Sequence, residues 1–224
     1  MDSKKIYAYM KRLFDSLFSM FILIIMSPII ILISIAIKLD SKGPILFKQQ
    51  RIGKDMKVFT IYKFRTMRID APKDCPPYMF ENPDIYITKI GKFLRKSSLD
   101  ELPQLLNIIK GEMSIIGPRP SSLKEVTLQN LREDKDVHSV LPGLTGWAQI
   151  NGRDEMTIQT KVKYDAEYIQ NFGIKMDFII FFKSIVKVLL QKNILEGRYC
   201  DDKNNESSSP SDINATITNT KTVD

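Results

Sequence analysis

The chain has 224 residues, enough for one compact catalytic unit with a membrane element and a tail, but short for two independent domains. Its 33 Lys and Arg against 26 Asp and Glu give a net charge of +7, which favours an anionic partner: nucleic acid, a phospholipid surface or a phosphorylated substrate. A single histidine and two distant cysteines, Cys75 and Cys200, argue against a serine-type triad, a disulfide framework and a zinc site.

An apolar segment follows the basic N-terminus. From Leu13 to Ile37 it carries no charge after Asp15, and it is long enough to cross a hydrocarbon layer of about 30 Å as one helix. Ser27-Pro28 lies near its middle, where proline removes a backbone donor and clashes with the preceding turn. Basic residues flank both ends, so the positive-inside tendency places both on the cytoplasmic side. The pattern predicts a re-entrant membrane helix broken at Ser27-Pro28, with a straight transmembrane span as the alternative.

The next elements follow from hydrophobic periodicity and turn residues. Residues 57–67 alternate as an extended segment with Lys63 and Arg65 on one face, which predicts a short β-hairpin. Residues 71–83 contain four prolines and indicate a surface loop. Helical patterns follow over residues 100–110, 122–132, 157–171 and 176–192.

The last helical pattern is strongly apolar and carries Lys183, Lys187 and Lys192. It predicts an amphipathic helix in the membrane interface with its lysines directed toward head groups, or alternatively a core helix. The whole chain is therefore expected to be α+β and predominantly helical. Three parts are predicted: a basic N-terminus with the re-entrant helix at 1–40, a catalytic domain with interfacial helices at 41–197, and a disordered tail at 198–224.

Two adjacent carboxylates, Asp100 and Glu101, stand at the start of a predicted helix that ends at Gly111. If Asp100 is the N-cap, Pro103 falls at the third helical position, where its missing N–H is not needed. A helix N-terminus offers free N–H groups and positive potential, which suits a phosphate and keeps Asp100 ionised. An ionised aspartate can be a covalent nucleophile and a neighbouring glutamate can hold Mg²⁺; alternatively, Asp100 only caps the helix.

Several cations could assist such a dyad. Arg119, between two prolines, would present a pre-set guanidinium to phosphate oxygens, or the turn is merely rigid. Lys63 and Arg65 could straddle two phosphates or guard a strand edge. Arg95 is a candidate cation or part of a solvated charge pair. The turn-rich stretch 142–153, which ends in Arg153, suits a nucleotide.

Four motifs occur in order behind the apolar segment: KFRTM at 63–67, SLDELPQLLNIIKGEMSIIGPRP at 98–120, PGLTGWAQINGR at 142–153 and KVKYDAEYI at 161–169. Together they resemble the monotopic phosphoglycosyl transferases, a family of bacterial sugar transferases, over about residues 11–192. The resemblance implies a re-entrant helix, amphipathic helices at the cytoplasmic surface of the inner membrane, and an Asp-Glu dyad on a small catalytic domain. The chain is expected to be the minimal form of the family, without the extra transmembrane bundle of longer relatives.

The resemblance implies a two-step reaction. Asp100 would attack the β-phosphorus of a UDP-sugar, release UMP and pass the sugar phosphate to polyprenol (undecaprenyl) phosphate, the first membrane step of a bacterial glycan pathway. Glu101 would hold Mg²⁺, while Lys63, Arg95 and Arg119 would neutralise phosphate charge. Asp165 would assist the metal or the lipid phosphate, and Arg153 would contact the nucleotide; both roles come from the resemblance.

The expected partners are a UDP-sugar, polyprenol phosphate and the phospholipid membrane, but not nucleic acid. Self-association and contact with downstream glycosyltransferases are further partners to test. The sugar and the final glycan stay open among capsule, O-antigen, exopolysaccharide and protein-linked glycan. One rival is a direct glycosyltransferase that uses Asp134 and Asp136 as a metal site and releases UDP. Another is a non-enzymatic basic membrane scaffold, which would release no nucleotide and leaves the dyad unexplained.

Overall fold

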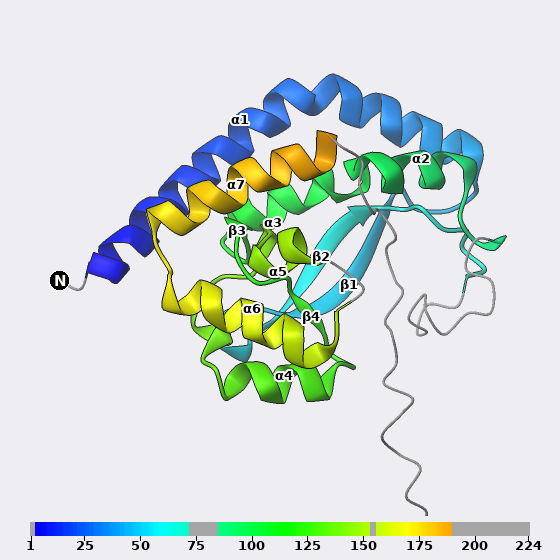
Figure 1. Ribbon diagram of the computed structural model, residues 1–224. Coiled ribbons are helices and arrows are strands. Elements are labelled where there is room, and N and C mark those ends of the chain that lie inside the picture. The colour runs from blue at the N-terminus through cyan, green and yellow to red at the C-terminus, as the bar shows by residue number, and fades with distance from the viewer. Residues whose placement is uncertain (1–2, 72–84, 153–155, 190–224) are drawn as a thin grey trace, which may run out of the picture.

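The computed structural model describes residues 3–71, 85–152 and 156–189. Helix α1 (Ser3–Asp40) arches over the top of the molecule, with α7 (Ile174–Leu189) and α2 (Lys89–Ser97) beneath it (Figure 1). At the opposite end, α4 (Val126–Glu133) packs against α6 (Ile158–Gln170). A β-hairpin lies between these layers. The predicted α+β, predominantly helical fold is confirmed.

The hairpin is formed by β1 (Leu46–Ile52) and β2 (Val58–Phe64), which pair antiparallel from Leu46 opposite Phe64 to Ile52 opposite Val58. A single short 3-10 turn, η1 (Lys54–Met56), joins them. Strand β4 (Ser121–Ser122) pairs with the other edge of β1, while β3 (Ser114–Ile116) and β5 (Gly143–Thr145) form a separate parallel pair. The hairpin prediction is confirmed, and the side chains of Phe59 and Ile61 are buried in the core.

The predicted helix at 100–110 forms in two pieces. A 3-10 helix, η4 (Leu99–Gln104), continues into α3 (Leu105–Lys110), and Gly111 ends α3 in the left-handed conformation with φ 90°. The N-cap of η4 is Ser98, which is also the C-cap of α2, with φ 56°. Asp100 is therefore not an N-cap: because one helix follows another without a linker, Asp100 lies inside the first turn.

The remaining helices lie near their predicted positions. The pattern at 122–132 becomes α4, the one at 157–171 becomes α6, whose N-cap Thr157 accepts from the Thr160 backbone N–H, and the one at 176–192 becomes α7. The periodicity missed α2 (Lys89–Ser97), and it also missed α5 (Trp147–Asn151) and η5 (Val137–Ser139), which are too short to show a helical repeat. The predicted loop at 71–83, apart from Ala71, and the predicted tail lie outside the described residues.

Pro28 lies inside α1, and the predicted break at Ser27-Pro28 does not interrupt the helix. Proline cannot donate to the carbonyl of Ile24, four residues earlier. The Ser27 hydroxyl donates to that same carbonyl at 2.8 Å, so the oxygen that Pro28 leaves without its backbone donor is still hydrogen-bonded. The result is a continuous but bent helix (Figure 1).

Both halves of α1 pack on the same protein body. In the N-terminal half, Lys11 pairs with Asp177 of α7 at 2.7 Å, and Ile22 and Leu23 pack against the core cluster around Phe59. In the C-terminal half, Ile33 and Ile37 are buried in a second cluster, against which Ile30 also packs. Only residues 24–29 separate these two sets of contacts, about 9 Å of helix at 1.5 Å per residue. This packing favours the re-entrant alternative over a straight span.

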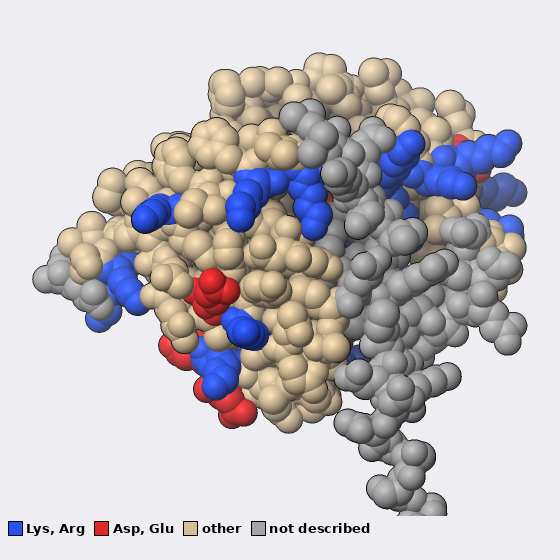
Figure 2. Space-filling view, viewed as in Figure 1, with Lys and Arg blue, Asp and Glu red and all other residues tan. Residues whose placement is uncertain are grey.

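The upper surface of the molecule is apolar. Among the described residues, α1 is the one helix long and apolar enough to cross a membrane, and most of its apolar side chains point away from the body. Figure 2 shows an uncharged surface over α1 and a row of basic side chains along α7 below it. Exposed apolar residues on neighbouring elements extend this surface: Phe93 of α2, Leu106 of α3, and Ile174, Phe178, Phe182, Ile185 and Val186 of α7. We call this set, with α1, the apolar cap.

The lysines of α7 were expected to reach head groups. That contact stays a prediction, but two of them also contact α5: the Lys187 ammonium donates to the carbonyls of Gln149 at 2.9 Å and Ile150 at 3.4 Å, and the Lys183 ammonium lies 5.0 Å from the centre of the Trp147 ring. They therefore attach α7 to the domain on the side opposite its exposed apolar residues. Lys192 lies outside the described residues.

Candidate active site

Glu101 is the centre of a charged cluster. Its Oε1 accepts from the Lys63 ammonium of β2 at 2.7 Å and from the Arg119 guanidinium at 3.0 Å. Burial by itself would raise the pKa of Glu101, but attraction to Lys63 and then Arg119 outweighs it and holds the pKa well below its usual range. The carboxylate is therefore ionised at neutral pH, and the structure brings three of the sequence-predicted site residues together.

Asp100 lies beside this cluster and is 3% exposed. Its segment is anchored by Leu102, which packs against both α1-facing core clusters, and by the buried Pro103. The flanking helices α2 and α3 carry the exposed Phe93 and Leu106 of the apolar cap. The two carboxylates thus lie on η4, between two helices that each carry an exposed apolar side chain.

The turn that bears Arg119 is formed by close backbone contacts between glycines. A Cβ on Gly143 would fall on the Gly117 nitrogen, and a Cβ on Gly146 would fall on the Gly117 carbonyl oxygen. The backbone N–H of Gly117 donates to Thr145 at 2.9 Å, and that of Gly143 donates to Pro118 at 2.8 Å. The glycines of the third motif therefore allow β5 to approach the arginine turn, which is a structural use that the sequence did not reveal.

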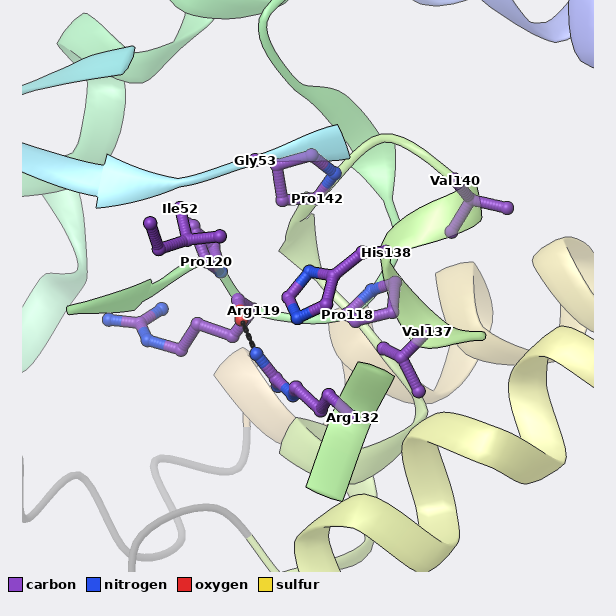
Figure 3. A pocket seen from close by; sticks show the side chains of 10 residues that line it. All are labelled: Ile52, Gly53, Pro118, Arg119, Pro120, Arg132, Val137, His138, Val140 and Pro142. Carbon is purple, nitrogen blue, oxygen red and sulfur yellow. Dashed lines mark hydrogen bonds between the residues drawn. The ribbon is translucent and has the colours of Figure 1, made fainter. Parts of the chain in front are cut away.

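Asp165 is not part of the Glu101 cluster, and its expected contact with a metal or lipid phosphate stays a prediction. It is 1% exposed, and its Oδ2 accepts from Arg132 Nε at 2.9 Å and from Arg132 Nη2 at 2.6 Å. Arg132 in turn donates through Nη1 to the backbone carbonyl of Arg119 at 2.9 Å (Figure 3). The reasoning from sequence missed Arg132, because it stands in a charged stretch typical of a solvated helix end.

The pocket behind this turn holds the only histidine of the chain (Figure 3). It is lined by Ile52, Gly53, Pro118, Arg119, Pro120, Arg132, Val137, His138, Val140 and Pro142. Burial, and then repulsion from Arg132, lower the pKa of His138, so its ring is neutral at pH 7. His138 therefore adds no positive charge beside Arg132.

Three other predicted cations have different outcomes. Arg65 is buried, and it donates to the carbonyls of Ser41 at 2.7 Å and Lys42 at 2.9 Å, where α1 ends. These hydrogen bonds fasten the end of α1 to β2, and the expected contact of Arg65 with phosphate stays a prediction. Arg95 donates to the Thr66 hydroxyl at 2.9 Å and ties α2 to the segment after β2. Arg153 lies outside the described residues.

Glu101 fits a role in holding Mg²⁺ together with substrate phosphates. Both of its side-chain hydrogen bonds fall on Oε1, and Oε2 takes part in none of those found in the described part of the chain. No group of three His, Cys, Asp or Glu residues suited to a metal occurs among the described residues. Mg²⁺ is commonly held by one or two carboxylates plus phosphate oxygens, so the dyad suits a metal ion that arrives with a diphosphate.

The sequence of the chain is similar to known proteins over most of its length. The family model of the bacterial sugar transferases matches residues 6–191. The chain is 41% identical over 190 residues to a Klebsiella pneumoniae protein named UDP-glucose:undecaprenyl-phosphate glucose-1-phosphate transferase, an alignment that covers 82% of this chain and 41% of that protein. The chain thus spans about two fifths of the length of that relative.

Two shorter relatives are covered almost completely. The exopolysaccharide production protein ExoY of Sinorhizobium fredii is 39% identical over 196 residues, which cover 81% of this chain and 86% of ExoY. The uncharacterized sugar transferase EpsL of Bacillus subtilis is 39% identical over 185 residues, which cover 83% of this chain and 90% of EpsL. The similarity therefore lies in the portion that carries the dyad, the arginine turn and the apolar cap.

Proposed function

Because the chain belongs to the bacterial sugar transferase family, we propose that it moves a sugar 1-phosphate from a UDP-sugar to polyprenol phosphate at the membrane surface. The observation that carries the proposal is the ionised Glu101 between Lys63 and Arg119, next to Asp100 and below the apolar cap. The proposed reaction joins a donor that is soluble in water to an acceptor that is embedded in lipid, so it requires a site near the membrane surface. The relatives named as undecaprenyl-phosphate sugar phosphotransferases support the choice of acceptor.

The first step is an in-line displacement at phosphorus. A carboxylate oxygen of Asp100 forms a bond to the β-phosphorus of the UDP-sugar, and the bond from that phosphorus to the oxygen bridging the two phosphates breaks. UMP leaves with the bonding electron pair, and the sugar phosphate stays on Asp100 as a mixed anhydride. The Arg119 and Lys63 cations, which meet Glu101 in the resting protein, stand within reach of the added phosphate charge.

The second step releases the product. A phosphate oxygen of the polyprenol phosphate attacks the same phosphorus, the bond to the Asp100 oxygen breaks, and polyprenyl-diphosphate-sugar leaves with the carboxylate restored. No electrons are exchanged with another reagent in either step. Mg²⁺ held by Glu101 would supply further neutralisation of phosphate charge. We place the dyad on the cytoplasmic face of the bacterial inner membrane, where both ends of α1 would also lie.

The proposal is tested with detergent-solubilised protein, a panel of UDP-sugars, Mg²⁺ and undecaprenyl phosphate. Release of UMP, together with a sugar-phosphate adduct on the intact protein when the acceptor is withheld, is the expected result. Asp100→Asn should show no adduct. Asp134→Asn is the matched control, since Asp134 is an exposed acid at the end of α4.

The nucleotide released separates this proposal from its rivals. UDP instead of UMP, with loss of activity in Asp134→Asn, would establish direct glycosyl transfer at the Asp134 and Asp136 acids. Absence of any released nucleotide across the panel would favour a scaffold. An Asp100→Asn protein that forms the adduct at the rate of the unmodified chain would refute the assignment of the nucleophile.

A further inference from the structure

Arg132 is the most deeply buried cation that the proposed reaction leaves without a task. It is 1% exposed, although arginine is almost never fully buried unless it is paired. Its partner Asp165, on α6, is buried to the same degree. Two hydrogen bonds of 2.9 and 2.6 Å between them hold the guanidinium plane in one orientation.

Arg132 donates a third hydrogen bond, outside the ion pair, to the turn that bears Arg119. Nη1 donates at 2.9 Å to the carbonyl oxygen of Arg119, and Figure 3 shows the Arg119 side chain leading away from this contact. At its far end that side chain meets Glu101 at 3.0 Å. One side of the Arg119 residue is thus held by the domain, while the other side carries the cation that faces the dyad.

The turn has few backbone donors of its own. Pro118 and Pro120, on either side of Arg119, lack an N–H group. The backbone of the turn is therefore held mainly by hydrogen bonds that its carbonyl oxygens accept. Three successive carbonyls receive such donors: Pro118 from the Gly143 backbone at 2.8 Å, Arg119 from Arg132, and Pro120 from Arg51 at 3.5 Å. The central one comes from the buried ion pair, and at 2.9 Å it is the shorter of the two that an arginine donates.

We propose that Arg132, held by Asp165, is a positioning residue that sets the Arg119 guanidinium at the distance from the dyad needed to receive a substrate phosphate. This inference rests on the proposed function, because it assigns Arg119 to the phosphates of the donor. Arg132 itself does not touch substrate: its side chain is buried, and its hydrogen bonds go to Asp165 and to the turn. A displacement of about 1 Å in such a cation can slow a phosphoryl transfer by about a hundredfold.

The test is a double-mutant cycle on the full chain in detergent with undecaprenyl phosphate. Arg132→Lys keeps the charge but cannot bond Asp165 twice and also reach Arg119. We expect it to lower the rate of the UMP burst by about 10- to 100-fold with a smaller change in KM. In an Arg119→Ala background the same substitution should change the rate by less than about threefold, since the group that Arg132 positions is gone. Arg68→Lys is the matched control, because Arg68 is exposed and pairs with Asp70.

A second measurement does not depend on activity. Hydrogen–deuterium exchange of peptides covering residues 114–122 should rise in Arg132→Lys and stay unchanged in Arg68→Lys. If the unmodified chain released no UMP, the proposed function would fail while this exchange experiment would still decide whether Arg132 holds the turn. Should Arg132→Lys not fold, Asp165→Asn keeps an oxygen acceptor at the same place and is expected to give a smaller loss of rate in the same direction.

Two results would overturn the proposal. One is an Arg132→Lys protein with a normal UMP burst and normal exchange. The other is an equal loss of rate from Arg132→Lys with Arg119 present and with Arg119 removed, which would make the ion pair a general contribution to stability. The proposal is supported if Arg132→Lys greatly lowers the rate of the UMP burst when Arg119 is present and has little effect in the Arg119→Ala background.

Discussion

The topology of α1 can be tested by asking from which side of the membrane its ends are reached. In a protein with Cys75 and Cys200 replaced by Ser, single cysteines are placed at Lys5 and Lys42, which are exposed residues at the two ends of the helix. A third cysteine replaces Ile25, an exposed apolar residue near the bend. The three positions sample the start of α1, its middle and the segment directly after its end.

The expected result follows from lengths in the structure. A straight span must leave about 20 residues free of the domain to cross about 30 Å of hydrocarbon. Contacts with the domain leave only residues 24–29 free, about 9 Å, and a span would detach Ile33 and Ile37 from their cluster. It would also remove the carbonyls of Ser41 and Lys42 from Arg65. Both ends are therefore expected on one side of the membrane.

The assay uses a membrane-impermeant maleimide on sealed vesicles of both orientations. Cysteines at positions 5 and 42 should react in inside-out vesicles and be protected in right-side-out ones, while the cysteine at position 25 should react in neither. Detergent provides the control, since all three should then be labelled. Reaction of positions 5 and 42 from opposite sides of the membrane would contradict this prediction and establish a straight span.

Three further predictions concern the site and its supports. Lys63→Met removes one of the two cations on the dyad glutamate, so kcat/KM should fall by about 10- to 100-fold, as expected for a charged hydrogen bond of about 1.5–3 kcal/mol. Burial, then repulsion from Arg132, lowers the pKa of Lys161 to about 8, so its amine is mostly charged below that pH and mostly neutral above it. Competitive amine labelling should reach half its maximum near pH 8 and shift upward in Arg132→Met, with the exposed Lys163 of α6 as reference. Gly146→Ala places a methyl group on the Gly117 carbonyl and should destabilise the protein by about 1–3 kcal/mol, measured by thermal unfolding in detergent beside Ala148→Gly as a control on helix α5.

Much of the site was accessible from sequence because its residues are close neighbours along the chain or obey a local rule. Asp100 and Glu101 are consecutive residues, so they lie together in any fold. The prolines on either side of Arg119 identify its turn in the sequence. The alternation of residues 57–67 predicts the hairpin that carries Lys63. The ion pairs of Lys63 and Arg119 with Glu101 then bring these predicted residues together. The glycine contacts behind the turn could not be foreseen, since they join segments about 25 residues apart.

Arg65 and Asp165 make contacts that the sequence did not predict. Both have the right chemistry in a recognisable motif, yet Arg65 binds the end of α1 and Asp165 binds Arg132. The sequence shows which residue carries a charge, but not whether the charged side chain contacts substrate or a buried partner. Only the packing of distant elements decides which of the two it meets.

By itself, the sequence determined that the chain has an apolar N-terminal helix with cationic flanks, a carboxylate pair and an arginine turn, because periodicity, charge and proline act over a few residues. The tertiary structure decided that α1 stays continuous through Pro28 and packs at both ends on one body. It also decided that Arg132 connects α6 to the active-site turn. The packing of α1 and the contact of Arg132 join residues far apart in the chain, and their free energies are set by burial and geometry that no local pattern records.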